Sequence, residues 1–163
     1  MPIHRFPIQL RFGDEDSNGH VNNVRYVQFL EEARVRLSLL PLEPAGSQEP
    51  AAEAETFRSV TRQAGSTVVA RQEIEYLTPL TYHQDPVWIE IWVSALGGSS
   101  FSYGFRIMDE DAGTVYAVAE AAMVMVGRES GRPEQLTDRQ RAILGSWAGG
   151  RVPFRREAAG AAK

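Results

Sequence analysis

The chain has 163 residues, of which 43% are hydrophobic, so it is long enough to form one globular domain with its own core. Its formal net charge of -4 argues against nucleic acid as a general partner, because phosphate binding favours a basic surface. It contains no cysteine, which excludes thiol catalysis, disulfides and thiolate metal sites. Neither a signal peptide nor an apolar run of the roughly 18 residues that span a membrane is expected. We therefore expect a cytoplasmic protein.

The first predicted element is a strand in which Ile8, Leu10 and Phe12 form one buried face. A polar turn follows, and Gly19 is expected there in a backbone conformation closed to other residues. A long helix begins next, with Asn22 or Asn23 as its N-cap. Pro41 ends this helix, whose apolar residues recur at helical spacing: Tyr26, Leu30, Ala33, Leu37 and Leu40.

The rest of the chain reads as strands separated by turn residues. Alternation predicts four strands, and Gly97-Gly98 marks a tight hairpin between two of them. In chain order we predict a long loop or short helix over 41–63, strands over 67–76, 87–94, 101–107 and 114–127, a loop over 127–133, a helix over 136–147 capped at Thr137, and a frayed tail over 148–163.

One long helix can bury its apolar face only against the concave face of such a sheet, because no other element is large enough. This predicts a single α+β domain over residues 1–147. The other sheet face must also be covered, since Trp88, Trp92 and the aromatic strand at 101–107 would otherwise be exposed. A second copy of the chain is the expected cover, so we predict a dimer.

The turn before the helix carries Asp14 and Asp16, close to the free N–H groups and positive dipole end of the helix. A carboxylate beside an anion-stabilising pocket is what acyl transfer requires. The run also matches the opening of a calcium loop, but position twelve of that loop is Arg25 instead of a bidentate glutamate. A purely structural role is the remaining alternative, because Asp and Asn commonly cap helices and shape turns.

The run GDEDSNGHVNNVRYVQFLEEAR resembles the acyl-CoA thioesterases of the hotdog fold, in the 4-hydroxybenzoyl-CoA thioesterase-like family. The similarity continues through VVARQEIEYLTPLTY and GGSSFSYGFRI and covers about residues 5–145. The resemblance implies an antiparallel five-stranded sheet wrapped around one long central helix, with edge-to-edge dimers that often pair into tetramers. It also implies hydrolysis of an acyl-CoA thioester to free acid and CoA.

The family's catalytic carboxylate falls on Asp16, as nucleophile or general base, and its oxyanion-binding helix start falls near Asn23 and Val24. His20 could orient the thioester or Asp16, or support the turn. In a separate hotdog lineage the catalytic carboxylate is a glutamate on the helix, so Glu31 and Glu32 are alternative catalytic residues. We nevertheless expect Glu32 to form an ion pair with Arg34. We expect no metal and no cofactor, with coenzyme A entering only as part of the substrate.

Coenzyme A is anionic, so its phosphates should lie along basic residues. Candidates are Arg128 and Arg132, with Ser99 and Ser100 as pantetheine or phosphate contacts; solvated loop residues are the alternative. Acyl carrier protein could replace coenzyme A. The acyl group could pack against Tyr26, Phe29, Tyr76, Trp88 and Trp92, or these residues could simply form a core.

Two rival functions remain open. A hotdog enoyl-CoA hydratase would pair an aspartate and a histidine with four residues between them, whereas Asp16 and His20 have three. A non-catalytic acyl-CoA binding module would bind the ester without releasing thiol.

Overall fold

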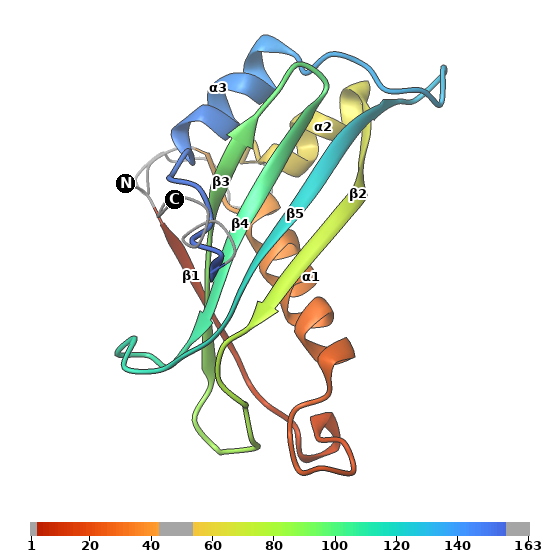
Figure 1. The fold of residues 1–163 in the computed structure, drawn as a ribbon. Helices are drawn as coiled ribbons and strands as arrows, with labels where there is room; N and C mark the ends of the chain where they lie inside the picture. Colours follow the sequence, from red (N-terminus) through yellow and green to blue (C-terminus); the bar gives the residue numbers. More distant parts are fainter. Residues whose placement is uncertain (1–2, 43–53, 156–163) are drawn as a thin grey trace, which may run out of the picture.

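The computed structural model describes residues 3–42 and 54–155, in which five antiparallel strands wrap around one long helix (Figure 1). The strands lie in the order β1-β3-β4-β5-β2, so β1 and β2 are the two edges of the sheet. The predicted hotdog arrangement is therefore confirmed. The strands are β1 (His4–Ile8), β2 (Gly65–Tyr76), β3 (Val87–Leu96), β4 (Ser100–Met108) and β5 (Val115–Gly127).

Helix α1 (Asn23–Ser38) lies on the concave face of the sheet. Four of the five predicted stripe residues, Tyr26, Leu30, Ala33 and Leu37, are buried on it together with Phe29. The helix ends at Ser38, earlier than predicted, so Leu40 lies beyond it and is partly buried. Asn22 is the N-cap, and its side chain accepts a hydrogen bond from the Val24 N–H. The helix thus starts at a fixed residue beside the aspartate turn.

Two short helices close one end of the sheet. Helix α2 (Phe57–Ala64) overlaps the predicted 41–63 segment and extends one residue past it; residues 43–53 of that segment fall outside the described chain. Helix α3 (Asp138–Ser146) is capped by Thr137, as predicted. It packs beside the β3–β4 hairpin, where Leu136 N–H and the Arg141 guanidinium both donate to the Gly98 carbonyl. No helix in the described ranges has the length and apolar character to cross a membrane.

The chain itself covers part of the outer face of the sheet. We expected a frayed tail from residue 148, but residues up to 155 run back over β3, where Trp92 Nε1 donates to the Gly150 carbonyl at 2.7 Å. Val152 and Phe154 bury themselves against Trp92 and Val118. Trp92 is therefore covered without a second copy of the chain.

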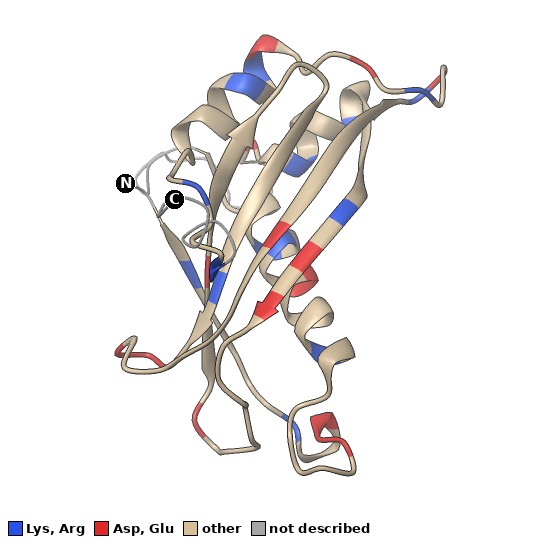
Figure 2. Cartoon of the chain, viewed as in Figure 1, with Lys and Arg blue, Asp and Glu red and all other residues tan. Residues whose placement is uncertain are grey.

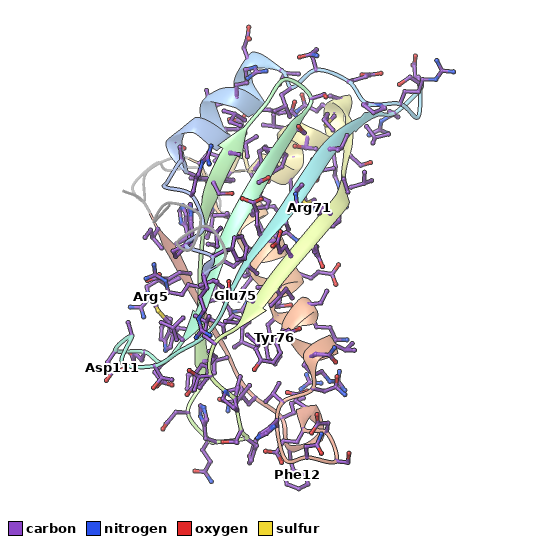
Figure 3. The ribbon with its side chains drawn as sticks, in the orientation of Figure 1. Arg5, Phe12, Arg71, Glu75, Tyr76 and Asp111 are labelled. Carbon is purple, nitrogen blue, oxygen red and sulfur yellow. The ribbon has the colours of Figure 1, made fainter. Side chains whose placement is uncertain are left out.

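The first strand ends earlier than the alternation predicted. Leu10 is buried, but Phe12 belongs to a short 3-10 helix (Phe12–Asp14) and is 76% exposed. It points away from the core and contacts Tyr82 edge-on. The turn therefore begins two residues before the first aspartate (Figure 3).

Candidate active site

Asp14 is the structural aspartate of the turn. Its side chain is buried, accepts a hydrogen bond from the Arg11 N–H at 2.8 Å and lies 3.3 Å from Arg25 Nε. Its carbonyl accepts the N–H of Asn22, which is the cap of α1. Asp14 therefore ties the turn to the helix start, and its carboxylate is occupied by protein groups.

Asp16 is held differently. One oxygen, Oδ1, accepts the N–H groups of Asn18 at 2.8 Å and His20 at 3.3 Å. Gly19 adopts φ +72 between them, the left-handed conformation that favours glycine and that the sequence predicted. The other oxygen, Oδ2, receives no hydrogen bond from the described residues. The turn thus orients the carboxylate and leaves one oxygen available.

The start of α1 offers one unused amide. The Val24 N–H donates to Asn22 Oδ1 at 3.0 Å, and the Arg25 N–H donates to the Asn22 carbonyl at 2.8 Å. Within the described chain, the Asn23 N–H has no acceptor. Val24 is 58% exposed and lies outside the pocket described next. Asn23 is therefore the helix-start donor that can receive a negative oxygen.

Asp16 and Asn23 line the same pocket, which has a volume of about 350 Å³. His20 and Tyr26 also line it, and the wall opposite α1 is Tyr76 with the segment 77–80. The Tyr26 and Tyr76 rings meet edge-on at 5.0 Å, and burial raises the pKa of both phenols. The pocket therefore brings together Asp16, which has one unpaired carboxylate oxygen, and Asn23, which has an unpaired backbone N–H, among tyrosine and aliphatic residues.

Comparison with known proteins assigns the chain to a family. Residues 10–144 match the Thioesterase-like superfamily. The chain belongs to this superfamily. It is 30% identical to a Xanthomonas campestris protein provisionally assigned as an acyl-CoA thioesterase, with 82% of this chain and 98% of that chain covered and a TM-score of 0.62.

A thioesterase from Thermus thermophilus, solved with coenzyme A and Zn, is 28% identical over 88% of this chain and 97% of that one, with a TM-score of 0.65. An uncharacterized Bacillus subtilis protein, YsmA, is 26% identical over 141 residues, which is 84% of this chain and 82% of that protein. The chain is thus a thioester hydrolase.

The expected coenzyme A contacts do not join Asp16 within one chain of this thioesterase. Ser99 and Ser100 lie in the β3–β4 hairpin beside α3. Arg128 follows β5, and its guanidinium donates to the Arg62 carbonyl; the Arg132 N–H donates to Ser130 Oγ. These residues sit near the start of β2, whereas Asp16 sits near its end. β2 has 12 residues, so the two ends are about 36 Å apart.

Two tryptophans expected near the acyl group are on the wrong face of the sheet. Side chains alternate along β3, so Val87, Ile89 and Ile91 face the core and Trp88 and Trp92 face outward. Trp88 instead lies under the Arg5 guanidinium. Of the five aromatic candidates, Tyr26 and Tyr76 line the Asp16 pocket, and Phe29 is buried in the core.

The alternative catalytic glutamates also lie away from the pocket. Glu31 Oε1 is 3.7 Å from Arg34, and Glu32 Oε1 is 2.9 Å from Arg36. The expected Glu32–Arg34 pair is wrong because residues two apart on a helix do not face each other, whereas those three or four apart do. Segment 77–80 was missed as a pocket wall; Pro79 signalled only the end of a strand.

Proposed function

We propose that this thioesterase cleaves acyl-CoA by using Asp16 and the Asn23 amide on one thioester. The observation that supports this is their common pocket, in which one Asp16 oxygen and the Asn23 N–H both lack partners among the described residues. The thioester carbonyl lies between them. Its oxygen accepts the Asn23 N–H as negative charge develops, which is worth a factor on the order of 10²–10³ in rate for one such donor.

Two routes satisfy this geometry. In the first, Asp16 removes a proton from water and the water oxygen adds to the carbonyl carbon. The C–S bond then breaks, and the CoA sulfur leaves as the thiol with the proton that Asp16 removed. In the second, Asp16 itself attacks, CoA leaves, and water then cleaves the mixed anhydride. In both, the His20 backbone holds Asp16 through two hydrogen bonds: its N–H donates to Oδ1 and its carbonyl accepts the Asp16 N–H at 2.8 Å.

The substrate carrier is coenzyme A, and no separate cofactor takes part. Coenzyme A is bound in the thioesterase of Thermus thermophilus, to which the chain is similar. An acyl carrier protein would need a docking surface instead. Comparing the rates of thiol release from acyl-CoA and from acyl-carrier-protein substrates therefore distinguishes the two carriers. The reaction takes place in the cytoplasm, where acyl-CoA is available.

The active assembly is an edge-to-edge dimer through β2. This 12-residue edge strand exposes Val68 and Val69, and a free edge favours pairing with another strand. Antiparallel pairing of two β2 strands places the start of one beside the end of the other. Arg128 of one protomer then approaches the Asp16 pocket of its partner. In Figure 2, acidic residues lie in the loops at the Asp16 end, and basic residues of α2 lie at the other end beside acidic residues of α3 and of the loop after β5.

Thiol release from a panel of acyl-CoAs tests the proposal. Asp16→Asn should lower kcat/KM by at least about 10²-fold, the usual contribution of a general base. Asp85→Asn, which changes an aspartate of a different loop, is the matched control and should leave kcat/KM unchanged. An Asp16→Asn protein that folds and keeps most of its activity would contradict the assignment. Tight acyl-CoA binding by the wild type without thiol release would indicate a binding module.

A further inference from the structure

A second cavity, of about 310 Å³, lies between α1, α2 and the start of β2. Phe57, Tyr103 and Met123 give it apolar walls. Arg34, Arg58 and Arg62 also line it, against a single acidic residue, Glu31. An excess of cations in a cavity of a protein with net charge -4 needs a physical reason.

Arg34 is the central cation of this cavity and lacks acceptors. Its side chain is 14% exposed, and burial lowers its pKa despite the opposing effect of Glu31. A guanidinium has five N–H donors. Among the described residues they meet only the Met123 sulfur at 3.5 Å and Glu31 at 3.7 Å, and the buried Nε has no partner. A buried charge this poorly paired is costly unless an anion binds beside it.

Helix α2 adds two more arginines to the same cavity. Arg58 and Arg62 are four residues apart, so they lie on one face of α2. Neither forms an ion pair with any residue in the described ranges. The Tyr103 side chain also faces this group, and burial raises the pKa of its hydroxyl, which therefore stays a neutral donor. The cavity thus presents several donors and a net positive charge.

A groove extends from this cavity toward the end of β2 that carries the Asp16 pocket. It runs between α1 and β2, and its apolar floor is Val27, Val69 and Ala70. Glu31 and Arg34 line both the groove and the cavity. The Asp16 pocket lies further along the same two elements, where Tyr26 precedes Val27 on α1 and Tyr76 follows Gln72 on β2. Asn23, where the thioester carbonyl lies, and Arg34 are eleven helical residues apart, which is about 16 Å. An extended chain of about ten bonds, together with the reach of the Arg34 side chain, covers this distance.

We propose that this cavity binds a carboxylate at the far end of the acyl group, so that the enzyme prefers thioesters of long dicarboxylic acids to those of plain fatty acids. The inference rests on the proposed thioesterase function. The methylene chain follows the groove, and the distal carboxylate accepts hydrogen bonds from Arg34, Arg58 and Arg62. A planar guanidinium suits a carboxylate because it can donate two parallel hydrogen bonds.

The test compares dodecanedioyl-CoA with dodecanoyl-CoA by thiol release. The wild type should prefer the dicarboxylic substrate in kcat/KM by at least about tenfold, and Arg34→Gln should lower that preference by roughly 10- to 100-fold, as loss of a charged hydrogen bond predicts. The Arg58→Gln/Arg62→Gln double variant, on the partly exposed α2, should act in the same direction if Arg34→Gln does not fold. Arg36→Gln is the control, since Arg36 lies on α1 outside the cavity and pairs with Glu32.

Pantetheine thioesters of the same two acids identify the anion. A preference that persists without the CoA phosphates supports the acyl carboxylate, whereas an Arg34 effect that disappears would assign the cavity to phosphate and overturn the inference. Arg34→Gln that abolishes self-association without changing the preference would overturn it too. If no substrate releases thiol, the proposed function fails. Calorimetry with the free acids then tests the cavity independently of catalysis. Dodecanedioate should bind the wild type more tightly than dodecanoate does, and this difference should disappear in the α2 double variant. Equal affinity of the wild type for the two acids would refute the site.

Discussion

The two aspartates of the turn should separate stability from catalysis. Asp14→Ala removes the acceptor of the Arg11 N–H, a charge-assisted hydrogen bond worth about 1.5–3 kcal/mol. It also removes the Arg25 ion pair, which is partly exposed and adds up to about 1 kcal/mol. We therefore expect the free energy of unfolding to fall by about 2–4 kcal/mol. Asp16→Asn keeps an oxygen that accepts the Asn18 and His20 N–H groups, so its free energy of unfolding should fall by no more than about 1 kcal/mol.

Urea unfolding followed by tryptophan fluorescence measures both free energies, and thiol release from dodecanoyl-CoA measures activity on the same samples. Asp14→Ala should retain catalysis in proportion to its folded fraction, whereas Asp16→Asn should be folded and inactive. The reasoning is refuted if Asp16→Asn is as unstable as Asp14→Ala, because Asp16 would then be a structural residue. It is equally refuted if the urea concentration at the midpoint of unfolding is the same for Asp14→Ala as for the wild type.

Three further outcomes are expected. Asn22→Ala removes the cap of α1 and should cost about 1 kcal/mol in urea unfolding; because it also loosens the Asn23 amide, kcat should fall about tenfold with KM little changed. Phe154→Ala should lower the free energy of unfolding by about 2 kcal/mol, less than the roughly 3–5 kcal/mol for a Phe in a deep core, because Phe154 packs in a small cluster on Trp92. An unchanged melting temperature would mean that the segment up to residue 155 contributes nothing to stability. Burial lowers the pKa of His4, so its neutral form favours the folded state; stability should be complete above pH 6.5 and decline as the pH falls through that value, and His4→Phe should flatten that part of the urea-unfolding pH profile.

Local pattern was sufficient for most elements. Alternation located β3 to β5 because one face of each lies on the core, and it also located β2, whose side chains are exposed or partly buried at the sheet edge. Gly97-Gly98 located the β3–β4 hairpin because few residues tolerate a tight turn. Thr137 was found as a cap, and the cap of α1 was narrowed to Asn22 or Asn23, because capping depends on a side chain and an N–H only two or three residues away. The resemblance of the aspartate turn to a known family was enough for the hotdog fold and the enzyme class.

Long-range contacts decided everything that local pattern left open. Phe12 followed the alternation of a strand, but the 3-10 helix Phe12–Asp14 turns it outward, where it contacts Tyr82 of a distant segment. Trp92 suggested a subunit interface, yet residues far along the chain cover it, and burial by a distant segment leaves no local trace.

The candidate site likewise depends partly on local sequence and partly on contacts made in the folded protein. Its two aspartates are two residues apart and chemically identical. The family resemblance pointed to Asp16, but the physical difference comes from the tertiary structure: the Arg11 and Arg25 groups occupy Asp14, while Asp16 lines a pocket whose far wall comes from segment 77–80. Sequence determines which groups stand near each other along the chain. Folding determines which of them remain without a partner, because hydrogen bonds are completed by groups from distant segments, and a carboxylate oxygen and an amide left unpaired in one pocket are the groups able to act on a substrate.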